Sequence, residues 1–207
     1  MTIRRSLRYG ILGLGLTALA GCSTLSSIQS ASTPLDTFEL TPLPAGVVTT
    51  SRSRRQLEVA LPTATGALSS DRILIKPTAL QIASLPDGRW VNETTELVQL
   101  LLVRSLANSD RFALVTSAGL GPPPDFVLMT DLRAFQAEVI NDRTTVVISS
   151  TMTLLRDTDD IVISSRRFTN SSFVTDTNAE SLVAAFDQVM TRQLADVVAW
   201  IVRSSGS

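Results

Sequence analysis

Apolar residues recur at helical spacing in the middle of the chain. They repeat every four positions in two series. One series is Leu97 and Leu101, and the other is Val98, Leu102 and Leu106. This spacing places them on one face of a helix. Asn92 is a suitable N-cap, so a helix is predicted from Asn92 to about Asn108.

A second apolar stripe lies near the C-terminus. The run Thr177-Asn178-Ala179-Glu180 has the spacing of a capping box, with Thr177 as the N-cap. Behind it, a stripe about 20 residues long follows helical spacing. Its members are Leu182, Phe186, Val189, Met190, Leu194, Val197 and Ile201. The sequence therefore predicts a long amphipathic helix as the last element.

Short alternating or continuous apolar runs predict the strands. The predicted strands are Thr37–Leu40, Gln56–Leu61, Ile73–Lys76, Gln81–Leu85, Phe112–Thr116, Asp125–Phe135, Thr144–Leu155 and Ile161–Thr169. Pro77 lacks the N–H that a ladder needs, so the third strand is expected to end before it. Pro86-Asp87-Gly88 favours a turn. The continuous run Phe126–Met129 predicts a strand covered on both faces.

The last two predicted strands have the clearest pattern. One face of the stretch 144–155 is apolar, with Val146, Ile148, Met152 and Leu154, and the other is polar, with Ser149, Thr151 and Thr153. A polar turn, Asp157–Asp160, joins it to the next strand as a hairpin. The order of strands, helix, strands and long helix predicts a single α+β domain over residues 37–203. It has a mixed or antiparallel sheet with two helices packed on one face, and residues 204–207 are a tail.

The first 21 residues have the form of a lipoprotein signal peptide. Arg4, Arg5 and Arg8 precede an uncharged apolar run that is too short to cross a bilayer. Leu19-Ala20-Gly21-Cys22 then matches the lipobox of bacterial lipoproteins, in which Cys22 is lipidated and becomes the first residue. Residues 22–36 are predicted to be this lipidated cysteine and a flexible tether rich in serine and threonine. By resemblance to bacterial lipoproteins in general, Ser23, at the position where an aspartate would retain the protein in the inner membrane, favours the outer membrane.

Charge and composition exclude several classes of protein. With 44% hydrophobic residues and a net charge of −1, the chain is not of the disordered type. Removal of residues 1–21 takes away three of the 18 basic residues and none of the 19 acidic ones. The mature chain of 186 residues then carries 15 basic and 19 acidic residues, a net charge of −4, which gives no basic field for nucleic acid.

Candidate chemistry is sparse. The chain has no histidine, which removes the commonest general base and metal ligand, and lipidation would consume its only cysteine, Cys22. The acidic run 157–160 lacks the glycine and downstream glutamate of a calcium loop. Glu93, Glu96 and Asp110 are carboxylates without the spacing of a glycosidase pair. We therefore expect no enzyme, no catalytic residue, no metal site and no cofactor.

Two further groups of residues have a structural and a binding interpretation. Arg52, Arg54 and Arg55 form a small basic cluster that is either a solvated loop or a contact for anionic headgroups or an acidic partner. Trp90 and Trp200 are either core or rim aromatic residues, or anchors of an interface. The sequence leaves both choices open.

Several motifs, taken in order, resemble those of the ABC-type transport auxiliary lipoproteins. They are Asp71-Arg72-Ile73, Arg89-Trp90, Ser109-Asp110-Arg111-Phe112, Asp125-Phe126-Val127-Leu128 with Leu132 and Phe135, Arg166-Arg167-Phe168, Ala184-Ala185-Phe186 and Trp200. The resemblance covers about residues 37–202. The chain departs from the family pattern at Asp110, where such proteins often have glycine.

The resemblance implies a non-enzymatic outer-membrane lipoprotein, lipid-anchored through Cys22 on the periplasmic face. Its implied partners are an MCE-domain protein and the ABC transporter subunits of one system, which moves lipids between the inner and outer membranes. Its working parts would be surfaces and strand edges, and formation of a homo-oligomer would extend the same role. Two alternatives stay open: an assembly or envelope-integrity lipoprotein that binds an outer-membrane β-barrel, and a periplasmic lipid carrier.

Overall fold

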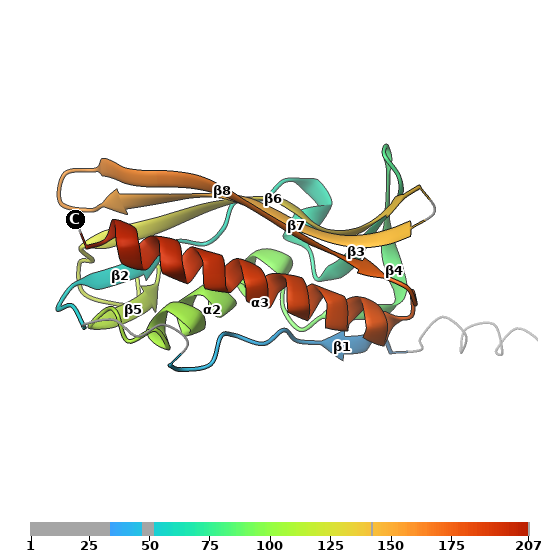
Figure 1. The fold of residues 1–207 in the computed structure, drawn as a ribbon, viewed down its shortest axis with the longest axis horizontal. Coiled ribbons are helices and arrows are strands. Elements are labelled where there is room, and N and C mark those ends of the chain that lie inside the picture. The colour runs from blue at the N-terminus through green and yellow to red at the C-terminus, as the bar shows by residue number, and fades with distance from the viewer. Residues whose placement is uncertain (1–33, 47–51, 142, 207) are drawn as a thin grey trace, which may run out of the picture. The chain divides into compact units, whose positions relative to one another are not determined.

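The computed structural model describes residues 34–46, 52–141 and 143–206 of the chain. The predicted signal peptide, the lipidation site Cys22 and the tether up to residue 33 lie outside the described residues. The domain that follows has an eight-stranded mixed sheet and two α-helices, which confirms the predicted α+β class (Figure 1).

The long strand β6, Phe126–Ile140, is the centre of the sheet. Along one edge it pairs antiparallel with β7, Arg143–Arg156, over nearly its whole length. β7 pairs in turn with β8, Ile161–Val174, as the predicted hairpin. These three strands form a long ribbon with the most extensive pairing in the molecule.

The other edge of β6 pairs with two separate groups of strands. Its first residues run parallel to β2, Gln56–Val59, and its later residues run parallel to β3, Arg72–Thr78. Beyond β2 lies β5, Leu114–Ser117, also parallel. Beyond β3 lie β4 and then β1, which are Gln81–Trp90 and Asp36–Phe38. The 3₁₀ turn η1, Gly66–Ser69, falls in the chain between β2 and β3 and buries Leu68.

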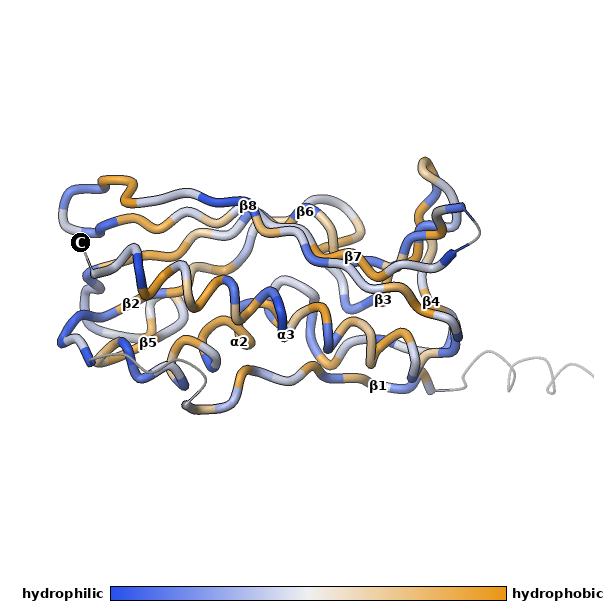
Figure 2. Tube along the Cα trace, viewed as in Figure 1, coloured by the Kyte–Doolittle hydropathy of each residue, from blue (hydrophilic) through white to orange (hydrophobic). Residues whose placement is uncertain are grey.

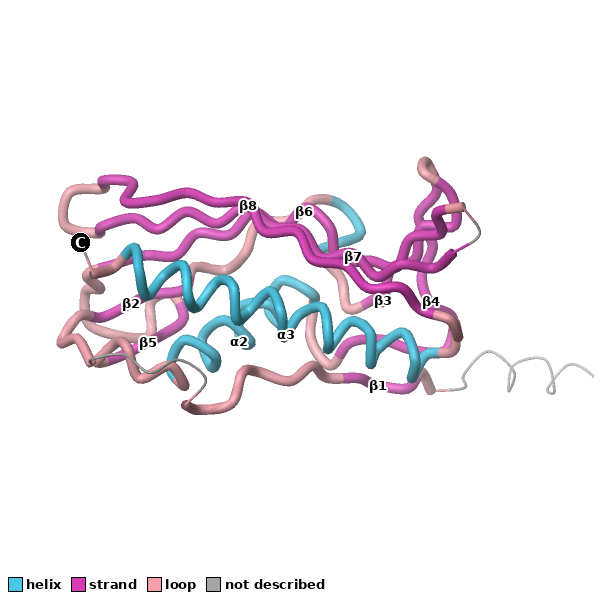
Figure 3. Tube along the Cα trace, viewed as in Figure 1, coloured by secondary structure: helices cyan, strands magenta, loops and turns pink. Residues whose placement is uncertain are grey.

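Helices α2, Thr94–Ala107, and α3, Ala179–Ser204, cover one face of this sheet (Figure 3). The predicted apolar stripes of both helices are buried, and α3 packs mainly on β7 and β8. Three aromatic rings meet in the core, where the Phe186 centroid lies 5.3 Å from both Trp90 and Phe135. The prediction of two helices on one face is confirmed.

The helix caps differ from the prediction by one residue each. Asn178, not Thr177, caps α3, and its Oδ1 accepts a hydrogen bond of 2.8 Å from the Ser181 N–H. The predicted cap of α2, Asn92, is replaced by Glu93. The Asn92 amide instead donates to the Glu96 carboxylate at 3.3 Å. At α3 two neighbouring polar residues compete for the cap, and the spacing alone does not rank them. At α2 Glu93 makes no side-chain cap hydrogen bond, and the Thr94 N–H donates instead to the Ser70 carbonyl oxygen at 3.0 Å.

The predicted turn at Pro86-Asp87-Gly88 is also wrong, because these residues lie inside β4. Between the pairs Arg72↔Arg89 and Leu74↔Ser84, β3 advances two residues while β4 advances five. The extra residues form a bulge, where a proline without an N–H is tolerated. Pro77 likewise lies within β3, which continues to Thr78.

Strand β6 is covered on one face rather than on both. Phe126 and Leu128 face the helices and are 3% and 0% exposed, whereas Met129 on the other face is 49% exposed. A register shift between Leu132 and Ala134 then changes which residues face the core. The continuous apolar run Phe126–Met129 therefore wrongly indicated that the face of β6 opposite the helices is buried.

Candidate interaction surface

The face of the β6–β7–β8 ribbon opposite the helices is open and rich in hydroxyl groups. Alternation in β7 buries Ile148, Met152 and Leu154 against the helices and turns the intervening residues outward. We call the outward hydroxyl-bearing residues of β7 and β8 the hydroxyl face: Ser149, Thr151, Thr153, Ser165, Thr169 and Ser171. The sequence predicted this polar alternation in β7 and gave it no function.

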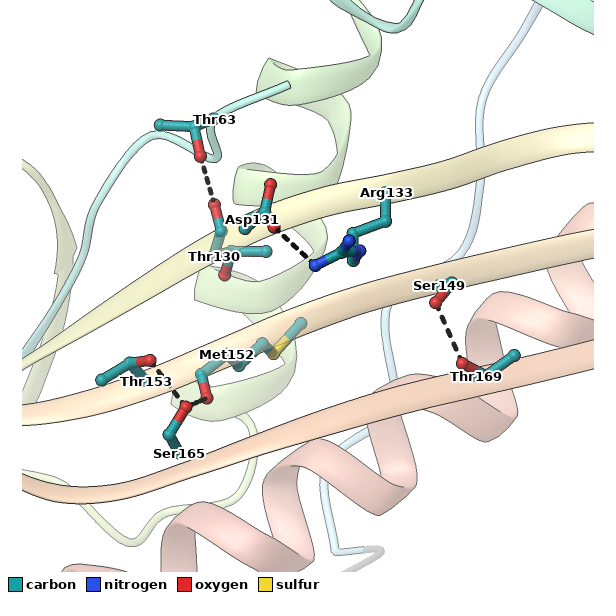
Figure 4. A network of polar contacts seen from close by, with 9 residues as sticks. All are labelled: Thr63, Thr130, Asp131, Arg133, Ser149, Met152, Thr153, Ser165 and Thr169. Carbon is teal, nitrogen blue, oxygen red and sulfur yellow. Dashed lines mark hydrogen bonds and ion pairs between the residues drawn. The ribbon is translucent and has the colours of Figure 1, made fainter. Parts of the chain in front are cut away.

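Cross-strand hydrogen bonds order part of this face. The Ser149 Oγ and Thr169 Oγ1 atoms are 2.9 Å apart, and the Thr153 Oγ1 and Ser165 Oγ atoms are also 2.9 Å apart (Figure 4). Each pair joins directly opposite residues of β7 and β8. Short paired hydroxyls leave a low, flat surface, because no long side chain stands above it at these positions.

Opposite charges flank the middle of the hydroxyl face. Asp131 of β6, Thr151 of β7 and Arg167 of β8 occupy one row across the three strands. The Arg133 guanidinium lies 3.4 Å from the Asp131 carboxylate, and both side chains are about half exposed. Such a pair near the surface contributes little to stability.

The three candidate carboxylates lie at the two ends of α2. Glu93 and Glu96 line an open hollow of about 400 Å³ at the start of α2, together with Asp71. Asp110 follows the end of α2, about 20 Å away along the helix axis. Asp71 forms an ion pair of 3.4 Å with Arg89, so its charge already has a partner. The structure therefore places Asp110 apart from Glu93 and Glu96.

The acidic run 157–160 is the turn between β7 and β8. The Arg156 Nε donates to the Asp159 carboxylate at 2.9 Å, and all four turn residues are exposed. Among the residues that the structure describes, no group of three or more acidic, cysteine or histidine side chains is placed to hold a metal ion. These contacts agree with the interpretation of the run as a solvated turn.

The basic cluster has one member with a structural role. Arg52, Arg54 and Arg55 are exposed. The Arg55 guanidinium lies 5.2 Å from the centre of the Phe126 ring and donates to the Ser205 carbonyl oxygen at 3.1 Å. Arg55 thus ties the start of β2 to β6 and to the end of α3, while the other two arginines remain on the exposed segment.

Both tryptophans belong to the core. Trp90 is 1% exposed and Trp200 is 5% exposed. The Trp200 ring packs edge-on against Phe168, and its Nε1 donates to the Ser164 Oγ at 3.0 Å. Of the two interpretations that the sequence left open, the structure supports the core role.

The motifs behind the family resemblance serve the fold. The Asp125 carboxylate accepts the Gln56 N–H at 2.7 Å, and the Ser109 Oγ donates to the Leu106 carbonyl oxygen at 2.6 Å at the end of α2. Asp110, the position where such proteins often have glycine, has a φ of 53°. This left-handed conformation favours glycine, which accounts for the pattern from which this chain departs.

The hairpin that joins β3 and β4 is a feature that the sequence pattern did not predict. Its turn is Ala79–Leu80, and Leu80 is 99% exposed. Figure 2 shows hydrophobic colouring near the tip of this hairpin, which projects from the sheet. The sequence did show that residues 77–86 carry no charge. The projection of Ala79 and Leu80 from the sheet is visible only in the fold.

No helix among the described segments is long and apolar enough to cross a membrane. The predicted apolar signal peptide lies outside the described residues.

Comparison with known proteins identifies relatives of sequence and of fold. Residues 38–199 match the family model described as ABC-type transport auxiliary lipoprotein component. The protein XCC0632 from Xanthomonas campestris has a similar structure, with a TM-score of 0.74 and 24% identity over 84% of this chain and 97% of that chain. The hypothetical protein CT253 from Chlamydia trachomatis has a TM-score of 0.50 and 14% identity over 72% of this chain and 96% of that chain. No curated protein matches the sequence significantly.

Proposed function

The chain belongs to the family of ABC-type transport auxiliary lipoproteins, and from this premise we propose that it docks an MCE-domain protein at the outer membrane. The family associates with ABC transport systems and is not a class of enzymes. In the proposed role, the protein is a fixed component of a system that moves lipids between the inner and outer membranes. It works by binding and holding, without catalysis.

The observation that carries the docking role is the open hydroxyl face. Two helices cover one side of the sheet, while the other side of the ribbon leaves Ser165, Arg167, Thr169 and Ser171 of β8 exposed and Ser149, Thr151 and Thr153 of β7 half-buried. A face lined by small hydroxyls and flanked by Asp131 and Arg167 offers hydrogen bonds and charge complementarity with little steric obstruction. These groups would supply polar contacts to a protein partner.

The anchor in this proposal is Cys22. Acyl chains on its sulfur contribute about 0.8 kcal/mol per buried CH₂, enough for stable attachment when two or more chains are present. Residues 23–34 contain seven serines and threonines and no charge, which suits a flexible connection to the domain. Ser23 supports the outer membrane as the membrane in which the anchor is held.

The packing of the core argues against the alternative role of lipid carrier. The apolar residues that could line a cavity, on α3 and on the inner face of β6, belong to one buried cluster. Phe186, Leu194 and Leu128 are each 0% exposed, and their neighbours in the cluster account for their burial without a bound lipid.

Crosslinking in the native envelope tests the docking role. The tagged, lipidated protein is crosslinked, the inner and outer membranes are separated, and the proteins captured from each are identified by mass spectrometry. We expect an MCE-domain protein in the outer-membrane fraction. Capture of an outer-membrane β-barrel alone would instead favour the assembly-lipoprotein alternative and overturn the proposed role.

A matched pair of variants tests whether the hydroxyl face makes the contact. Thr169→Arg places a long cation on this face, and Ala184→Arg places the same side chain on an exposed position of α3. We expect the first variant to reduce capture of the partner by tenfold or more, as for loss of about 1.4 kcal/mol. The second variant is expected to leave capture unchanged. Equal capture by both would exclude the hydroxyl face as the docking surface.

A further inference from the structure

The tip of the β3–β4 hairpin is apolar, uncharged and exposed. Pro77, Thr78, Ala79, Leu80, Gln81 and Ile82 are all exposed, with Leu80 at 99% and Ile82 at 57%. Neither lysine, arginine, aspartate nor glutamate occurs from residue 77 to residue 86. Exposed strand ends usually carry charges that prevent association, so an uncharged projecting tip calls for a contact that favours apolar residues.

The fold itself gives no reason for leucine at this position. Leu80 is outside the buried core, so its side chain adds nothing to the packing. The described non-glycine residues with positive φ are Asp110, Asn141 and Asp160, so the turn does not require a special conformation at Leu80. A polar residue would serve the turn equally well and would avoid the cost of exposing a large apolar side chain.

The hairpin tip lies toward the side from which the N-terminal chain enters the domain. Strand β1 pairs parallel with β4, with Asp36 opposite Gly88 and Phe38 opposite Trp90. The two strands run in the same direction, and the start of β1 and the hairpin tip lie at the same end of the domain (Figure 1). From Gly88 back to Gln81 is seven residues, which span at most about 23 Å because β4 is bulged between Ser84 and Arg89.

The length of chain before β1 allows the tip to reach the anchoring membrane. Cys22 and Asp36 are 14 residues apart, a span of at most about 50 Å. This span exceeds the distance of at most about 23 Å between the start of β1 and the tip. A membrane that holds the sulfur of Cys22 is therefore within reach of Leu80.

A second exposed apolar side chain lies at the same end of the sheet. Phe173 is 71% exposed, and the Arg143 guanidinium lies 6.0 Å from the centre of its ring. Phe173 shares a row with Thr145, Glu138 and Lys76, the last of these on the strand that leads to the tip. An aromatic ring beside an arginine suits the boundary between acyl chains and anionic headgroups.

We propose that the β3–β4 hairpin tip, through Leu80 and Ile82, inserts into the lipid surface that holds the anchor of Cys22. The contact gives the tethered domain a preferred orientation, with its anchored end on the membrane and the β7–β8 turn directed away from it. This inference rests on the proposed anchoring at Cys22.

A fluorescent reporter at the tip tests the proposal in the full lipidated chain. In Leu80→Cys, the sulfur of Cys22 is blocked by its lipid, so an environment-sensitive label attaches only at position 80. The protein is reconstituted into vesicles of phosphatidylethanolamine and phosphatidylglycerol. We expect a blue shift of the emission and its loss when lipids with quencher-labelled acyl chains are included.

Thr158→Cys is the matched control, because Thr158 is exposed in the β7–β8 turn. Its label is expected to emit as in water and to resist the lipid quencher. Water-like emission at both positions would overturn the proposal. A blue shift at position 80 that persists without vesicles and grows with protein concentration would also overturn it, because it would indicate a contact between copies.

Mass spectrometry of the same sample separates this proposal from the anchoring on which it rests. A mature chain without lipid at Cys22 would refute the anchoring. The label at position 80 is then read on Cys22→Ser protein held to nickel-chelating lipid by an N-terminal histidine tag. Quenching in that arrangement supports the hairpin contact, and its absence overturns it.

Discussion

At the scale of single residues, a substitution at Phe186 best tests whether the apolar stripe of α3 is part of the core. Its ring stacks on Phe135 and meets Trp90 edge-on, with both centroids 5.3 Å away, and it is 0% exposed. Phe186→Ala would remove these contacts and leave a cavity. We expect it to lower the free energy of unfolding by about 3–5 kcal/mol, measured by denaturant titration.

The chain offers the same substitution at an exposed phenylalanine. Phe173→Ala is expected to change the free energy of unfolding by less than about 0.5 kcal/mol, because this side chain is 71% exposed. An unchanged midpoint for Phe186→Ala would mean that the α3 stripe is a partner surface and not core.

A substitution at Asp110 is expected to stabilise the domain. With a φ of 53°, it is in a conformation that costs any residue with a Cβ. Asp110→Gly should relieve that cost and raise the free energy of unfolding by about 0.5–1 kcal/mol. Asp157→Gly, in an exposed turn and without a positive φ, is the control and should bring no gain. A loss of stability in Asp110→Gly would show that the aspartate side chain makes a contact of greater value.

At the scale of elements, the start of α3 distinguishes two possible caps. Asn178→Ala removes the hydrogen bond of 2.8 Å to the Ser181 N–H and should lower the free energy of unfolding by about 1 kcal/mol. Thr177→Ala alters the residue that the spacing alone had indicated and should have a smaller effect. Thermal denaturation of both variants ranks them, and a larger effect at Thr177 would contradict the assigned cap.

The sequence predicts those elements whose local pattern and final environment agree. The two helices and the β7–β8 hairpin have a pattern that is consistent along their whole length, so their existence and buried faces follow from it. Ile148, Met152 and Leu154 are 0% exposed, as the alternation requires. The polar side of the same alternation predicted an open face, which became the candidate interaction surface.

Other features depend on partners that are distant in the chain. The local sequence around Pro86 predicts a turn. Pro86 belongs instead to a bulge because the register between β3 and β4 shifts there. The local sequence predicts that Met129 is buried. Met129 is exposed because no helix among the described residues covers the outer face of β6 at this position. The exposure of Leu80 likewise depends on how far the β3–β4 hairpin projects beyond the rest of the sheet. Local pattern cannot supply these relations, because each is a property of tertiary arrangement.

At the scale of the whole molecule, anchoring and folding should be separable. The buried core of the described residues begins at Leu40, well after Cys22. We therefore expect Cys22→Ser to release the protein from the membrane fraction while its melting temperature stays unchanged. Fractionation followed by thermal denaturation of the purified variant measures both properties. Failure of the variant to fold would contradict a tether that is independent of the domain.

The position of β6 has a consequence for the order in which the domain folds. β2 and β3 both pair with β6, and neither pairs with the other. As the ribosome extends the chain, residues 36–117 can form α2, the β3–β4 hairpin and other local contacts, but the two groups of strands stay unjoined until residues 126–138 follow. The rate-limiting step of folding should therefore be the capture of β6, a late and non-local event. Until that step, the apolar residues of β2 and β3 remain accessible, and chaperones have a defined interval in which to act.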